Sequence, residues 1–148
     1  MDPQQLADEW EIRQQLARFA RILDSKAYDR MEEVYAQDLR FDYGIGGEQA
    51  GIETMRGLLR QFLDTCGPTQ HLIGSIAIEV IGDDAISRAY VQARHQRFDD
   101  IGGPVFDTCG DYVDRWARTG DGWRIVRRDV EWSIFSGDPA VLGSLDLA

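Results

Sequence analysis

The chain has 148 residues, a formal net charge of -10, and a composition that is 43% hydrophobic and 10% aromatic. This length predicts one domain, residues 1–148, that is large enough to bury a core. The acidic balance argues against a nucleic-acid or anionic-membrane partner, because both need a basic surface. A small hydrophobic substrate is compatible with it.

Targeting signals and cysteine chemistry point to an ordinary intracellular protein. The sequence contains no run of about 18 apolar residues and no basic, then apolar, signal segment at its start, so we predict a cytoplasmic protein with no membrane span. Cys66 and Cys109 lack metal-ligand spacing. In a reducing compartment they are expected to be buried hydrophobic residues rather than a disulfide.

The N-terminal segment predicts a helix with an unusually placed acid. Asp2 followed by Pro3 is a typical helix start. The apolar positions that follow have helical spacing and form one stripe: Ile12, Leu16, Phe19 and Leu23. An acid in the last turn, Asp24, is unfavourable by about 0.3–1 kcal/mol. It therefore either caps a following helix or serves the function.

The next segments alternate between helix and strand. A second helix is expected from about residue 27, and residues 39–43 alternate as a short strand that ends at the glycine-rich turn 44–47. This turn lacks the lysine and the Ser/Thr of a phosphate-binding loop. A third helix is expected over residues 52–66, closed by Gly67-Pro68.

Both histidines lie on a predicted β-hairpin, residues 69–100. A three-residue loop, 82–84, would place His71 and His95 on one face among small side chains. The larger side chains would then lie on the other face: Leu72, Ile76, Ile78, Val80, Tyr90 and Phe98. A two-residue loop would put the two imidazoles on opposite faces, so the site depends on this turn.

Two further strands complete the pattern. Residues 105–118 and 123–135 are expected to pair through the turn 119–122. Helices followed by long antiparallel strands predict an α+β fold. The sheet must curve to cover its helices, and its concave side would form a pocket.

Several segments together resemble the nuclear-transport-factor-2-like superfamily of cone-shaped α+β barrels, and most of all its SnoaL-like, scytalone dehydratase-like group. They are residues 23–30, 39–43, 69–74 and 95–100, together with the turn Gly-Asp-Gly-Trp-Arg-Ile at 120–125. The resemblance implies a curved antiparallel or mixed sheet with three N-terminal helices covering a central pocket. It also implies a homo-oligomer, with a trimer favoured over a dimer, and Tyr90 and Phe98 on the outer face are candidate contacts.

The same resemblance implies a cofactor-independent lyase, a dehydratase acting on a hydrophobic cyclic hydroxy-carbonyl compound. His71 matches the histidine that removes a proton next to a carbonyl, and Asp24 matches the carboxylate that orients it. His95 matches a second histidine, and Tyr43 a tyrosine that polarises the carbonyl through a water. A related dehydrochlorinase is similar in its Asp and His pair. The pKa of an ordinary histidine, about 6.5, suits a base near neutrality.

We expect substrate contacts from Leu23, Ile73, Val91 and Tyr112. The pocket departs from the family pattern, because Leu23 replaces a tyrosine, and Gly110 and Tyr112 fall where the family has a serine and an asparagine. A substrate other than scytalone is therefore expected.

Other interpretations remain open at this point. The same base could shuttle a proton in a ketosteroid-isomerase-like isomerase, or the chain could be a non-catalytic small-ligand-binding module. Two histidines and an aspartate can also bind a metal, but no HxH or HExxH spacing is present, so we expect no metal. The expectation that no cofactor is needed comes from the resemblance. Taken singly, His71, His95 and Tyr43 could equally be structural residues.

Overall fold

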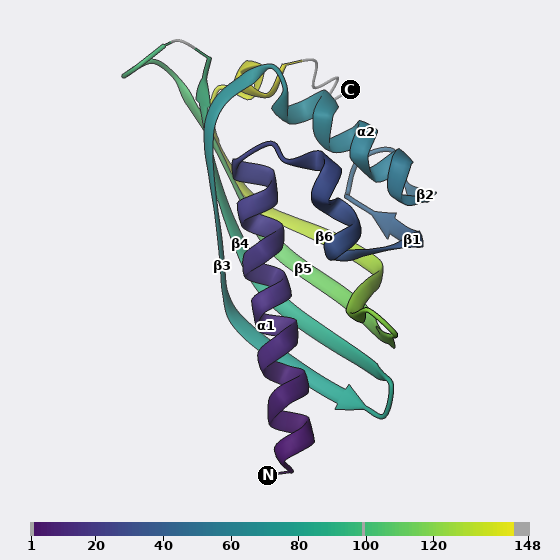
Figure 1. The fold of residues 1–148 in the computed structure, drawn as a ribbon. Helices are drawn as coiled ribbons and strands as arrows, with labels where there is room; N and C mark the ends of the chain where they lie inside the picture. Colours follow the sequence, from purple (N-terminus) through teal and green to yellow (C-terminus); the bar gives the residue numbers. More distant parts are fainter. Residues whose placement is uncertain (1, 99, 144–148) are drawn as a thin grey trace.

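The computed structural model describes residues 2–98 and 100–143, which form a six-stranded sheet with helices on one side (Figure 1). The elements in chain order are α1 (Pro3–Asp24), the 3-10 helix η1 (Tyr28–Glu33), β1 (Tyr35–Asp42), β2 (Glu48–Ala50), α2 (Ile52–Leu63), β3 (Cys66–Ile81), β4 (Asp84–Arg97), β5 (Val105–Thr119), β6 (Gly122–Gly137) and the 3-10 helix η2 (Pro139–Leu142). The strand order is β2-β1-β6-β5-β4-β3, and β1 is parallel to β6 while the other neighbours are antiparallel. The predicted α+β class is confirmed.

Helix α1 begins and packs as its sequence predicts. The Asp2 carboxylate accepts a hydrogen bond from the Gln4 backbone N–H at 3.0 Å, which satisfies one of the free donors of the first turn. The apolar stripe of α1 is fully buried against the inner face of the sheet. Figure 1 shows α1 running along β3. None of the described helices combines the length and apolarity needed to span a membrane.

The second predicted helix is a 3-10 helix of six residues, η1. Its apolar side chains are buried as expected, but the last of them belong to the sheet, because the Ile125 N–H donates to the Val34 carbonyl at 2.8 Å and Tyr35 pairs with Ile125. Strand β1 therefore begins at Tyr35, four residues before the predicted start. Parallel pairing with β6 outweighed the local helical spacing.

The third predicted helix ends at Leu63, three residues early, because Cys66 pairs with Arg97 and so belongs to β3. Pro68 is tolerated in β3 because this strand lies at the edge of the sheet, where a missing N–H need not break a ladder. Strand β2 and helix η2 are additional short elements. The predicted turn at residues 44–47 is present and joins β1 to β2, a strand that was not predicted.

The hairpin of β3 and β4 has a two-residue loop, not the predicted three-residue loop, since Ile81 pairs with Asp84. That register alone would place the two histidines on opposite faces. A β-bulge between Gly74 and Ala77 adds one residue to β3. The extra residue exchanges the two faces on which successive side chains of β3 lie, relative to those of β4. Ser75, in this bulge, has a φ of +48°, which is uncommon for a residue with a side chain.

Beyond the bulge, His71 pairs with Ala93 and Thr69 pairs with His95, so both imidazoles lie on the inner face. The prediction of a shared face is confirmed, although the reason given for it was wrong. The bulge also moves Ile76, Ile78 and Val80 onto the inner face, where they pack partly buried against the core, which corrects their predicted placement. Leu72, Tyr90 and Phe98 are exposed, and an oligomer contact through them stays a prediction.

Candidate functional site

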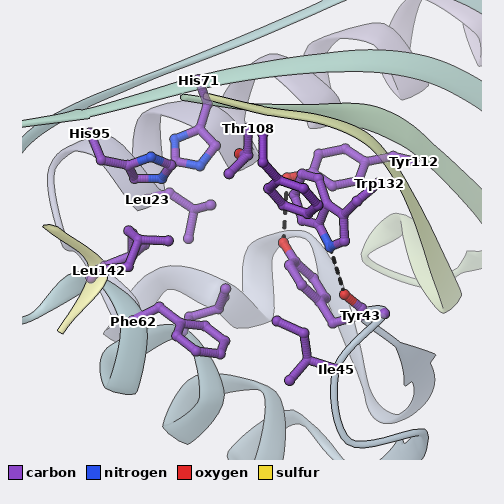
Figure 2. Close-up of a pocket in the computed structure, with 14 residues that line it drawn as sticks. Leu23, Tyr43, Ile45, Phe62, His71, His95, Thr108, Tyr112, Trp132 and Leu142 are labelled. Atoms are coloured by element: carbon purple, nitrogen blue, oxygen red, sulfur yellow. Dashed lines mark hydrogen bonds between the residues drawn. The ribbon is translucent and has the colours of Figure 1, made fainter. Parts of the chain in front are cut away.

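A cavity of about 360 Å³ lies between the inner face of the sheet and the helices (Figure 2). Most of its wall is apolar, from α1, α2, β6, η2 and the 44–47 turn. The full set of lining residues is Leu23, Tyr43, Gly44, Ile45, Leu59, Phe62, Leu63, His71, His95, Thr108, Tyr112, Trp132, Phe135 and Leu142. A cavity of this size and polarity suits a small, largely apolar ligand held by a few polar groups.

The carboxylate of Asp24, at the end of α1, makes three hydrogen bonds, two of them to His71 and one to Thr69. Its Oδ1 lies 2.7 Å from His71 Nδ1 and accepts from the Thr69 hydroxyl at 2.9 Å, and its Oδ2 accepts from the His71 backbone N–H at 3.0 Å. Burial alone would raise the pKa of Asp24, but the bonds from His71 and Thr69 outweigh it and hold that pKa below its usual value. Asp24 does not cap η1, whose N-cap is Ala27 without a side-chain bond.

This contact fixes the chemistry of the His71 ring. Because a carboxylate only accepts hydrogen bonds, Nδ1 carries a proton, and in the neutral ring Nε2 has a free lone pair. The side chain of His71 is only 6% exposed and lines the cavity. The arrangement gives the cavity a proton acceptor whose ring is oriented by the Asp24 carboxylate.

His95 lies beside His71, with ring centroids 5.8 Å apart and ring planes at 90°. Its Nδ1 donates to the Phe106 carbonyl oxygen at 2.8 Å, since a carbonyl can only accept. Burial lowers the pKa of His95 to about 4, although the bond to Phe106 opposes this. Near neutral pH, His95 therefore presents Nε2 as a hydrogen-bond acceptor and cannot donate to an enolate oxygen.

Two tyrosine hydroxyls, from β5 and from the residue after β1, form the other polar part of the cavity. The Tyr43 and Tyr112 oxygens lie 3.4 Å apart, and the Trp132 indole N–H donates to the Tyr43 backbone carbonyl at 2.9 Å. Burial raises the pKa of both tyrosines, with Arg128 opposing the rise. Both hydroxyls therefore stay protonated, and the one that accepts from the other keeps a proton free to donate elsewhere.

Behind the tyrosines lies an ion pair that the sequence analysis did not identify. Arg128 and Asp114 are both fully buried and form two hydrogen bonds, at 2.7 and 2.8 Å. The guanidinium also donates to the Tyr35 hydroxyl at 2.9 Å, and its carbon lies 4.0 Å from the ring centroid of Tyr112. The sequence could have indicated this pair, because Asp114 is two residues from Tyr112 on the same strand and so lies on the same inner face. Arg128 is its direct partner on the neighbouring strand.

The structure brings together most of the predicted site residues. Leu23 and Tyr112 line the cavity as expected. Val91 and Ile73 do not: Val91 is fully buried in the core and Ile73 packs against that core from the edge strand. Thr108 lines the cavity and was missed, although its parity with Tyr112 on β5 could have revealed it. Among the described residues, no three histidine, cysteine or acidic side chains are grouped as a metal site requires.

The curved sheet, the helices on its concave side and the cavity between them define an α+β cone. The family model of the SnoaL-like domain matches residues 4–129, so the chain belongs to this family. The uncharacterized protein Rv2910c of Mycobacterium tuberculosis is 32% identical over 133 residues, which cover 88% of each chain.

Solved structures share the fold at low sequence identity. The Kfla4162 protein from Kribbella flavida has a TM-score of 0.83 at 23% identity, over 92% of this chain and 97% of its own. A candidate scytalone dehydratase from Novosphingobium aromaticivorans has a TM-score of 0.83 at 18% identity, over 92% and 91% of the two chains. A type 2 hexachlorocyclohexane dehydrochlorinase, LinA, has a TM-score of 0.78 at 15% identity, over 90% of each chain.

Proposed function

We propose that the protein is a cofactor-independent lyase that eliminates water from a neutral, cyclic hydroxy-carbonyl compound. The observation that carries the proposal is the 2.7 Å contact between Asp24 and His71 Nδ1, which leaves Nε2 as the free acceptor of a ring lining an apolar cavity. The fold is shared with a candidate dehydratase and a dehydrochlorinase, and both names describe eliminations. The shared fold supports elimination as the type of reaction.

His71 would act first as a base. Its Nε2 removes the proton next to the carbonyl, and the Asp24 carboxylate stabilises the imidazolium that forms. The developing negative charge on the carbonyl oxygen needs a donor, which the tyrosine pair of Tyr43 and Tyr112 supplies. Behind that pair, the ion pair of Arg128 and Asp114 packs against the ring of Tyr112 and supports its position.

The leaving hydroxyl group then needs a proton, and the geometry restricts its source. His95 is unprotonated near neutral pH, so the imidazolium of His71 is the proton donor at this end of the cavity. One group thus removes the proton and returns it to the departing oxygen. We therefore expect both bonds to break on the same face of the substrate, a syn elimination.

The wall of the cavity supports a neutral substrate. No lysine, arginine, aspartate or glutamate is among the described residues that line it, so a carboxylate or phosphate would lose its hydration without gaining a counter-charge. The volume of about 360 Å³ suits a molecule of one or two rings.

The experiment uses 3-hydroxy-1-tetralone, because loss of water gives 1-naphthol, which is followed by its fluorescence. We expect the wild-type protein to form 1-naphthol and His71→Gln to do so at least 100-fold more slowly, within the range of about 10²- to 10⁴-fold for a lost general base. Gln92→Ala, on the outer face of the sheet, is the control. Undiminished turnover by His71→Gln would contradict the proposal.

Two alternatives are separated by simple measurements. An isomerase using the same base would give a product of unchanged mass, whereas elimination lowers the mass by one water. A binding module needs no aligned carboxylate–imidazole pair, and the contact between Asp24 and His71 weighs against it.

A further inference from the structure

The inner face around His95 contains three polar groups that converge on one part of the cavity. His71 on β3, Ala93 on β4 and Thr108 on β5 form one cross-strand row, because His71 pairs with Ala93 and Ala93 pairs with Thr108. His95 lies in the next row and is a diagonal neighbour of both His71 and Thr108. Ala93 has only a methyl group, so no long side chain separates the other two. Figure 2 shows His71, His95 and Thr108 directed to the cavity.

Two of these groups, on His95 and Thr108, can form hydrogen bonds that the described residues do not supply. His95 uses Nδ1 on the Phe106 carbonyl, which leaves the Nε2 lone pair without a protein partner among the described residues. Thr108 is only 5% exposed and lines the cavity. Its hydroxyl makes no hydrogen bond to residues 2–98 or 100–143. Both residues line the cavity, so a ligand group that can both donate and accept could satisfy the two together.

We propose that His95 and Thr108 form a subsite for the leaving group and select a hydroxyl over a halide. This inference rests on the proposed elimination and deepens it by naming the group that departs. A hydroxyl can donate its own proton to His95 Nε2 and accept a hydrogen bond from the Thr108 hydroxyl. A halide has no proton to donate, so it would face the lone pair of His95 and leave that buried acceptor unsatisfied.

The reaction step balances without any further reactant. His71 Nε2 takes the proton from the carbon next to the carbonyl, and the electron pair of that C–H bond forms the new carbon–carbon double bond. The carbon–oxygen bond breaks, and its electron pair stays on the departing oxygen. That oxygen takes the proton from His71 Nε2 and leaves as water, so His71 returns to its neutral form and nothing is oxidised or reduced. Thr108 stabilises the negative charge that develops on this oxygen.

Two matched substrates test the subsite, because 3-hydroxy-1-tetralone and 3-chloro-1-tetralone both give 1-naphthol and differ only in the leaving group. We expect Thr108→Val, a variant of nearly equal shape, to lower kcat/KM for the hydroxy compound by about 10- to 100-fold, in keeping with a hydrogen bond that strengthens in the transition state. The chloro compound should lose much less, because chloride is a better leaving group and a weaker hydrogen-bond acceptor than hydroxide and so depends less on the Thr108 hydroxyl. Thr108→Ser should restore the rate for the hydroxy compound. Equal losses for both compounds would overturn the inference.

His95→Phe provides an independent variant, since it keeps an aromatic ring and removes the acceptor. It should slow the hydroxy compound and leave the chloro compound unchanged or faster, because the repulsive lone pair is gone. A parallel loss with both compounds would show that His95 has only a structural role. Melting temperatures of each variant check that the fold is retained.

A binding measurement separates failure of this inference from failure of the proposed function. The unreactive pair 2-tetralol and 2-chlorotetralin lack the carbonyl group and cannot eliminate through an enolate. By calorimetry, we expect the wild-type protein to bind the alcohol at least 10-fold more tightly than the chloride, and Thr108→Val to lose that preference. If the tetralones are not turned over but this preference holds, the lyase is wrong and the subsite stands. Equal affinities, or no binding of either compound, would overturn the subsite.

Discussion

The burial of an uncharged His95 predicts a specific loss of stability in mild acid. Burial lowers its pKa from 6.5 to about 4 in the folded protein. Between these values the unfolded chain binds more protons than the folded one, so stability is fully present above pH 6.5 and is lost as the pH falls toward 4. The perturbation is therefore a change from pH 7 to pH 5, applied to the wild type and to His95→Gln, which cannot titrate.

The size of the effect follows from the two pKa values. Their difference corresponds to about 3 kcal/mol in full, of which about 2 kcal/mol is lost by pH 5. Carboxylates with lowered pKa values act at lower pH: Asp8, paired with Arg118, has a pKa of about 2, and the pKa of Asp24 also lies below its usual value. The chain has two histidines, so a His71→Gln control separates the contribution of the other one.

Urea unfolding at pH 7, 6 and 5, followed by tryptophan fluorescence, measures this loss. We expect the free energy of unfolding of the wild type to fall about 2 kcal/mol more than that of His95→Gln over this range. Changes in overall repulsion as the net charge of -10 is reduced affect both proteins alike and cancel in the comparison. Equal pH dependence in the two proteins would refute the claim that His95 is buried in its neutral form.

Three further predictions concern the support of the site. Arg128→Met should lower the free energy of unfolding by about 3–5 kcal/mol in urea, because it leaves Asp114 charged and unpaired in the core, and adding Asp114→Leu should recover part of that loss. Asp24→Asn should lower 1-naphthol formation by roughly 100-fold at an almost unchanged melting temperature, and a variant as active as wild type would show that His71 needs no orienting carboxylate. Deleting Ser75 should abolish 1-naphthol formation, because the bulge disappears and His71 can no longer share a face with His95. A folded, active deletion variant would contradict this.

The fold was predictable from the sequence because local patterns and long-range packing agree over most of the chain. The stripe on α1 and the strand-rich second half each specify one structure. The misplacements occur where a tertiary contact competes with a local signal. Val34 and Tyr35 follow helical spacing but complete a parallel ladder with β6, and Cys66 follows α2 in sequence but pairs with β4. Such pairings depend on partners many residues away.

The candidate site was predictable in part, for a different physical reason. Resemblance pointed to Asp24 and His71, and the structure places their side chains in contact. The buried pair of Arg128 and Asp114 was missed because charged residues in strands are normally read as solvent-facing. Thr108 was missed because one threonine on a strand carries no signal until the neighbouring strands place it against an open cavity.

The register of the hairpin explains how the two histidines come to act together. A two-residue loop and one extra residue in β3 each reverse the parity of the pairing, and together they restore it. The bulge costs backbone strain, since Ser75 adopts a positive φ there. It nevertheless orients the side chains of two regions of β3. Below it, Ile76 and its alternate neighbours face the core beside α1, and above it His71 faces the cavity. A regular strand could satisfy only one of these regions, so the bulge makes the core and the site compatible in one strand.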